Sequence, residues 1–113
     1  MVSLQSVSRR QHHRFERPQL AVRLNGAEGQ TKDWSLGGLA VQLGDGALSR
    51  FDESDQVSGE LEVGSQGLRH PFEGRVVRVD EDRDVVALEF SRLSEGAVMT
   101  FVGYFRTMMV GAH

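Results

Sequence analysis

Apolar and polar residues alternate along most of the chain between positions 18 and 90, which is the period of β-strands with one buried face. Residues 56–63 show this best, with valine, glycine and leucine on one face and serine and glutamate on the other. Turn-forming pairs such as Asn25-Gly26 separate the segments. Pro71 is expected at a sheet edge or a bulge. The predicted strands are Gln19–Asn25, Gln30–Trp34, Leu39–Leu43, Gln56–Val63, Leu68–Val79 and Val85–Phe90.

Short strands at this spacing indicate a mainly β fold, a small antiparallel β-barrel of about six strands. From Ser94 the apolar spacing changes to that of a helix, with Ser94 as its cap and Glu95 in the first turn. We expect this C-terminal α-helix to plug or flank the barrel. Additional apolar residues at 104, 108 and 110 widen its apolar surface, which is also typical of a docking face for a protein partner. The expected buried face contains Val98, Phe101, Val102, Phe105 and Met109.

With 113 residues, 39% of them hydrophobic and 26% charged, the chain has the composition of one soluble globular domain. It contains no cysteine, which excludes disulfides, thiolate metal sites and a cysteine nucleophile. The N-terminus lacks the apolar run of a signal peptide, and no stretch approaches a membrane span. These features predict a cytoplasmic protein that does not insert into membranes.

Charge is distributed unevenly along the chain. Residues 1–25 carry five arginines against Glu16, a local balance of +4, while the whole chain has a net charge of −3, so the rest carries −7. A basic segment on an acidic body favours a small anionic ligand over a long polyanion. Residues 1–17 are polar without periodicity and are predicted to form a flexible arm before the barrel domain of residues 18–113. A solvated cationic tail would explain the charge alone equally well.

Two short motifs near the N-terminus combine the side chains that a guanine nucleotide requires. The first is an R-x-x-x-R formed by Arg10 and Arg14, and the second is a D-x-S-x-x-G formed by Asp33, Ser35 and Gly38. Guanidinium groups match both the O6/N7 edge of guanine and phosphate oxygens. A carboxylate can accept from the N1–H and N2–H₂ donors of guanine, a hydroxyl adds a hydrogen bond, and glycine permits close backbone approach.

The two motifs, in this order and on either side of the first predicted strand, resemble those of the PilZ domain, a bacterial receptor module for cyclic di-GMP. The likeness spans about residues 8–110 and includes the barrel with its C-terminal helix. It implies that the ligand lies between the arginine loop and the strand surface of the second motif. Arg10 and Arg14 would then bind guanine edges and phosphates, Asp33 and Ser35 would bind a guanine, and Gly38 would be needed for its missing side chain.

Two further arginines extend the expected site. Arg9 directly precedes the first motif, as in family members that bind an intercalated pair of cyclic di-GMP molecules, so two nucleotides per chain are expected. Arg78 lies on a predicted strand, from which it either reaches the same face and stacks on a base or points into solvent. The resemblance also implies a protein effector, second-messenger signalling and an ordering of the arm when the ligand binds.

Other functions receive less support from the sequence. Asp33 and Ser35 are also common turn residues, and Gly38 could mark a bulge. His12 and His13 lack a third ligand at metal-binding spacing, and no catalytic constellation is recognisable, so we expect neither a metal, nor another cofactor, nor an enzyme. The rival interpretations are a PilZ-like adaptor that binds no nucleotide and a small-barrel binder of single-stranded nucleic acid. The acidic body and the scarcity of strand aromatics disfavour the latter.

Overall fold

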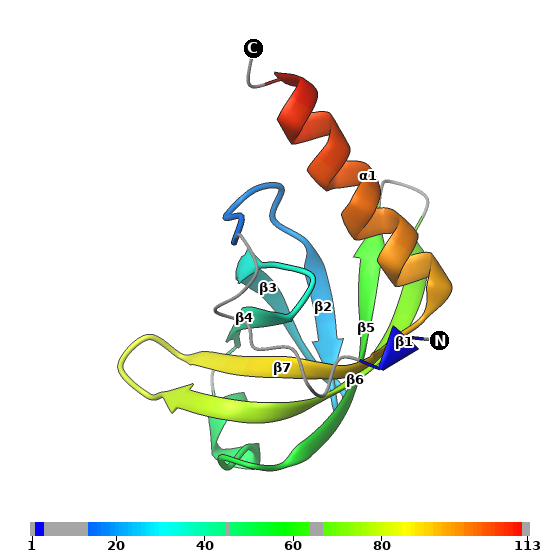
Figure 1. The fold of residues 1–113 in the computed structure, drawn as a ribbon. Helices are drawn as coiled ribbons and strands as arrows, with labels where there is room; N and C mark the ends of the chain where they lie inside the picture. Colours follow the sequence, from blue (N-terminus) through cyan, green and yellow to red (C-terminus); the bar gives the residue numbers. More distant parts are fainter. Residues whose placement is uncertain (1, 4–13, 45, 64–66, 112–113) are drawn as a thin grey trace.

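Six antiparallel strands close into a β-barrel, and one helix packs beside it (Figure 1). The computed structural model describes residues 2–3, 14–44, 46–63 and 67–111. A short 3₁₀ helix spans Ala47–Arg50. The remaining elements are β1 (Val2–Ser3), β2 (Ala21–Leu24), β3 (Ala27–Trp34), β4 (Gly38–Leu43), β5 (Gln56–Val63), β6 (Leu68–Asp80), β7 (Val85–Leu93) and α1 (Glu95–Gly111).

The strands follow one another around the barrel in the order β7, β4, β3, β2, β5, β6, and β6 pairs with β7 to close it. The predicted fold class, a small six-stranded barrel with a C-terminal helix, is therefore confirmed. The two-residue strand β1 adds to the edge of β7, with Val2 opposite Leu93. It was not among the predicted strands, because two residues are too short to show a period.

The strand boundaries differ from the predicted ones where turns or partners decide them. Asn25 and Gly26 both have positive φ, 48° and 85°, the geometry of a tight hairpin turn, so β3 begins as early as Ala27. Strand β7 continues past Phe90 to Leu93 because β6 and β1 both pair with its end. Pro71 pairs with β5 only, since β6 first meets β7 at Phe72, so it lies at a local edge as predicted.

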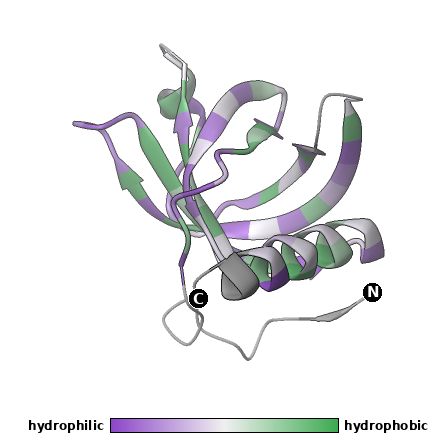
Figure 2. Ribbon diagram, turned by 90° about the horizontal axis from the view of Figure 1, so that it is seen from above, coloured by the Kyte–Doolittle hydropathy of each residue, from purple (hydrophilic) through white to green (hydrophobic). Residues whose placement is uncertain are grey.

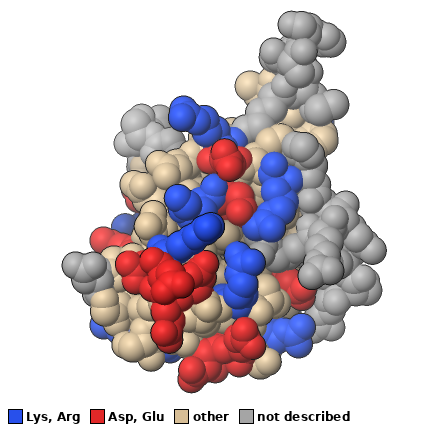
Figure 3. All heavy atoms as spheres, turned by 90° about the vertical axis from the view of Figure 1, so that its left-hand side faces the viewer, with Lys and Arg blue, Asp and Glu red and all other residues tan. Residues whose placement is uncertain are grey.

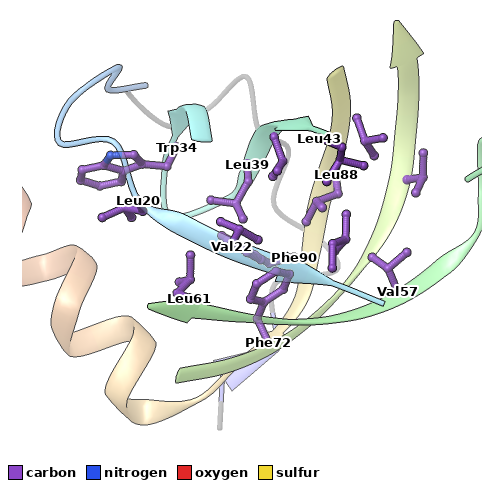
Figure 4. Packing of buried hydrophobic residues seen from close by; sticks show 14 of the residues in the cluster. Leu20, Val22, Trp34, Leu39, Leu43, Val57, Leu61, Phe72, Leu88 and Phe90 are labelled. Atoms are coloured by element: carbon purple, nitrogen blue, oxygen red, sulfur yellow. The ribbon is translucent and has the colours of Figure 1, made fainter. Parts of the chain in front are cut away.

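Inward-facing residues of all six barrel strands form one hydrophobic core (Figure 4). Figure 2 shows the alternation of hydrophobic and hydrophilic residues along the strands that produces it. The largest fully buried side chains are Trp34, Phe90 and Phe101. Burying an aromatic or leucine side chain contributes roughly 1.5–3 kcal/mol each, so this core is the main source of stability for the sheet.

Helix α1 is capped as predicted, since the Ser94 hydroxyl accepts from the Ala97 N–H at 3.1 Å. Ala97 and Phe101 are fully buried, and the helix extends away from the strands at its C-terminal end (Figure 1). The predicted buried face is wrong at Phe105, which remains 39% exposed because the helix leaves the barrel before its last turns. The Phe105 ring contacts that of Phe15, and the side chain of Met109 lies outside the described residues.

Candidate functional site

The residue that directly follows the R-x-x-x-R motif pairs with the last residue of β3, the strand that carries Asp33. Phe15 and Trp34 form an isolated antiparallel bridge in which each N–H donates to the other residue's carbonyl at 2.9 Å. Successive side chains along extended chains point in opposite directions. Arg14 and Asp33 consequently face outward together, whereas Phe15 and Trp34 face the core, where their tilted rings pack with centroids 4.9 Å apart.

Arg14 and Asp33, both predicted site residues, form an ion pair on this outward side. The Arg14 Nε–H donates to Asp33 Oδ1 at 3.0 Å, and its Nη2 donates to the same oxygen. The side chains are 39% and 24% exposed, so the pair lies at the surface. Two motifs that are 19 residues apart in sequence are thereby joined at one point.

Ser35 and Gly38 form the tight turn between β3 and β4. The Ser35 hydroxyl oxygen accepts from the N–H groups of Gly37 and Gly38, at 3.0 and 3.2 Å, and the side chain is 1% exposed. The Ser35 N–H in turn donates to the Gly38 carbonyl at 2.9 Å. Ser35 therefore has the position of a turn residue, and the turn follows directly after the end of the strand that carries Asp33.

The outer face beside Asp33 is a floor of small apolar side chains. Leu39 and Val41 point into the core, so Ala40 between them points outward, where it groups with Val85 and Ala87 in a separate cluster. Ala40 and Ala87 are 2% and 1% exposed. These short side chains are therefore almost completely covered, although they point away from the core. We call Ala40 and Ala87 the alanine floor.

Arg78 ends a row of paired residues that begins at Asp33 and crosses four strands. Asp33 pairs with Ala40, Ala40 with Ala87, and Ala87 with Arg78 across β3, β4, β7 and β6. Directly paired residues point to the same side of a sheet, so Asp33 and the exposed Arg78 both point out of the barrel, three strands apart. This orientation is compatible with both placements predicted for Arg78.

An open hollow of about 740 Å³ adjoins this face. Its lining residues are Arg14, Phe15, Glu16, Arg17 and Asp33. Figure 3 shows basic and acidic side chains interleaved over the side of the barrel that carries β3 and β4. The guanidinium groups of Arg14 and Arg17 give the hollow donors suited to phosphate or to a base edge. A smaller and more apolar hollow of about 460 Å³, between β2, β5 and β6, is lined by no residue of either motif.

The described residues do not include Arg9, Arg10, His12 and His13. Among the residues that the structure describes, no three His, Asp or Glu side chains are grouped so that they could hold a metal ion. Within the same residues, no helix is both long and apolar enough to cross a membrane. The described site thus rests on Arg14, Asp33, their supporting turn and the alanine floor.

The fold and site define a class of protein: a small closed β-barrel with a C-terminal helix and an arginine–carboxylate site on its outer surface. The model of the PilZ domain matches residues 8–106, and the chain therefore belongs to the PilZ domain family. The family consists of receptor and adaptor modules. The resemblance seen in the two sequence motifs is confirmed by this match.

Solved structures show the same fold. The Bacillus subtilis inhibitor of motility, MotI/DgrA, superimposes with a TM-score of 0.73 at 21% identity, covering 95% of this chain. This chain spans 54% of the length of that MotI chain. The PilZ domain of Escherichia coli YcgR, solved with c-di-GMP, gives a TM-score of 0.67 at 15% identity and covers 93% of this chain and 95% of its own. A search of curated proteins found no match to this sequence.

Proposed function

We propose that this domain is a cyclic di-GMP receptor that passes the signal to a protein effector. The observation that carries the proposal is the meeting of Arg14 and Asp33 beside the alanine floor. A guanidinium and a carboxylate side by side complement the acceptor edge and the donor edge of guanine, and we place its ring over the alanine floor beside them. Membership of the PilZ family and the YcgR structure solved with c-di-GMP support the same ligand.

In this proposal Arg14 exchanges partners when the nucleotide binds. Asp33 accepts N–H donors from the Arg14 guanidinium, and the N1–H and N2–H₂ groups of guanine are donors of the same kind. A guanine can therefore replace Arg14 on Asp33, and Arg14 then turns to a guanine O6/N7 edge or a phosphate. Arg10 makes the same type of contact from the other end of its motif. Ser35 and Gly38 keep Asp33 in position through the turn.

The remaining arginines set the extent of the site. Arg78 closes the far end of the alanine floor, where its planar guanidinium can stack on a base. Arg9 supplies the positive charge needed when two stacked nucleotides bring four phosphates together. Binding of the nucleotide orders the N-terminal arm, residues 1–17, and changes the surface that an effector meets, with α1 as the contact for that effector.

Competition binding tests the ligand. A labelled cyclic di-GMP bound to the full chain should be displaced by unlabelled cyclic di-GMP, and far less effectively by cyclic AMP, GMP or a single-stranded oligonucleotide. Equal or stronger displacement by the oligonucleotide would instead support the nucleic-acid binder. If no labelled nucleotide is retained, the domain is the alternative adaptor that acts without one.

A further inference from the structure

A cluster of aromatic rings joins the described part of the arginine motif to helix α1. Trp34 stacks against Phe101 at 5.1 Å and lies 5.8 Å from Tyr104, with both distances between ring centroids. Phe15 packs on Trp34 and also meets Phe105 edge-on at 5.7 Å. These five residues, which we call the aromatic cluster, are contributed by the segment before β2, by β3 and by α1.

The two residues of the aromatic cluster outside α1, Phe15 and Trp34, each stand next in sequence to a proposed ligand-binding residue. Phe15 follows Arg14, and Trp34 follows Asp33. The outward side chains form the ion pair and the inward rings contact the helix. The indole N–H of Trp34 donates to the Pro18 carbonyl at 3.0 Å, which ties the segment after the motif to the same ring.

The contact between Phe15 and Phe105 is the adjustable part of this arrangement. Trp34 and Phe101 are 1% and 0% exposed, so their contact cannot be lost without opening the core. Phe105 is 39% exposed and Phe15 is half-buried, so their rings can separate while the barrel remains intact. The position of residues 14–15 therefore depends on where the later turns of α1 lie.

We propose that Phe15 and Phe105 couple nucleotide binding to the docking of helix α1 on the barrel, an inference that rests on the proposed function. The docked helix holds Phe15 on Trp34, which fixes the backbone of Arg14 beside Asp33 before the ligand arrives. Fixing a binding residue in advance removes part of the ordering cost of binding, so the docked helix raises the affinity. Because such coupling is reciprocal, bound nucleotide must also stabilise the docked helix.

Substitution of Phe105 separates this coupling from direct contact with the ligand. Phe105→Ala removes the ring that holds Phe15 and should weaken cyclic di-GMP binding about fivefold or more, although Phe105 carries no ligand-binding group. Met99→Ala is the matched control, because Met99 is 71% exposed on the same helix and makes none of the ring contacts. Phe105→Leu keeps an apolar side chain in case the alanine variant unfolds, and circular dichroism verifies folding.

Hydrogen exchange provides a second readout that needs no ligand. The Phe15 N–H donates to the Trp34 carbonyl, so its exchange rate reports the pairing of the arm. Exchange at Phe15 should accelerate in Phe105→Ala and stay unchanged in Met99→Ala. In the unmodified chain, cyclic di-GMP should slow exchange in the later turns of α1.

The outcomes distinguish the inference from the function on which it rests. If the unmodified chain binds cyclic di-GMP and Phe105→Ala binds equally well with unchanged Phe15 exchange, the coupling is wrong and the proposed function stands. An equal loss of affinity in Met99→Ala also overturns the coupling. If the unmodified chain binds no cyclic di-GMP, the proposed function fails, and the inference about nucleotide coupling fails with it.

Discussion

Arg14 and Asp33 occupy one another's hydrogen-bonding groups, so a guanine that uses the Asp33 carboxylate must displace the guanidinium. Surface ion pairs of this kind contribute about 0–1 kcal/mol, since water screens them and holding the side chains costs entropy. In the proposed exchange the guanine offers two donors to Asp33, and its other edge or a phosphate gives Arg14 a new acceptor. The pair also keeps both groups solvated and in place.

The arginines of the first motif should each contribute directly to affinity. Arg10→Ala and Arg14→Ala remove a charge-assisted contact and should each cost about 1–3 kcal/mol of binding free energy, with the fold unchanged. Titration of each variant with cyclic di-GMP measures the loss. Arg50→Ala, an exposed arginine on the short 3₁₀ helix, serves as the control for charge alone. Normal binding by a folded Arg14→Ala variant would contradict the assigned role.

Asp33 should determine the choice of base. Adenine lacks the N1–H and N2–H₂ donors, so the unmodified chain should bind cyclic di-GMP more tightly than cyclic di-AMP, and Asp33→Ala should reduce this preference. The ratio of the two affinities, measured for both proteins, is the test. Equal affinity of the unmodified chain for the two nucleotides would remove the reason for assigning Asp33 to guanine.

Among the elements, β3, β4, β7 and β6 supply the row of paired residues from Asp33 to Arg78, with the alanine floor between them. Its outward alanines are buried even though they point away from the core. A strand face of this kind differs from the solvated outer faces elsewhere on the barrel, such as that of Ser58 on β5. The difference makes the alanine floor testable by substitution.

A longer side chain on the alanine floor should obstruct the nucleotide. Ala87→Gln should weaken cyclic di-GMP binding at least about tenfold, ~1.4 kcal/mol, because the added atoms occupy the space proposed for the base. Ser58→Gln on the outer face of β5 adds the same side chain away from the site and should leave affinity unchanged. Thermal unfolding of both variants verifies that they fold. Unchanged affinity of Ala87→Gln would exclude the floor from the ligand site.

Replacing glycine by alanine should change the free energy of unfolding in opposite directions at Gly59 and Gly103. A Cβ at Gly59 on β5 would meet the Phe72 ring and lie 2.7 Å from the Arg23 carbonyl oxygen, so Gly59→Ala should destabilise the fold by ~1–3 kcal/mol. A Cβ at Gly103 in α1 meets nothing within 4 Å, and alanine there should add about 0.5–1 kcal/mol. Denaturant unfolding compares them. A stable Gly59→Ala variant would contradict the described packing of β5 on β6.

For the whole molecule, the sequence pattern was sufficient to predict the barrel and the helix. Alternation and turn residues are local, so six strands and the Ser94 cap could be located without knowing their partners. The pairing of Phe15 with Trp34 was not predicted, because it lies beyond the β2–β3 hairpin in a segment whose sequence has no apolar period. The role of Ser35 could not be decided either, since a hydroxyl in a motif fits a ligand contact or a turn equally well.

The uneven charge of the chain predicts how many nucleotides it binds. Two stacked cyclic di-GMP molecules carry four phosphates, and their repulsion requires Arg9 in addition to Arg10 and Arg14. We expect two nucleotides per chain and a strong weakening of binding by salt, because these charges are exposed to solvent screening. Arg9→Leu should lower the number toward one without abolishing binding. An unchanged count with slower association would mean that Arg9 acts only through long-range attraction.

The most direct test is a calorimetric titration of cyclic di-GMP into the unmodified chain at low salt, with GMP and cyclic AMP titrated in parallel. It measures the ligand preference and the stoichiometry in one experiment. We expect saturable binding of cyclic di-GMP at two molecules per chain, and little or no heat from the two mononucleotides. The absence of cyclic di-GMP binding would contradict the receptor function, and saturation at one molecule would contradict the role of Arg9.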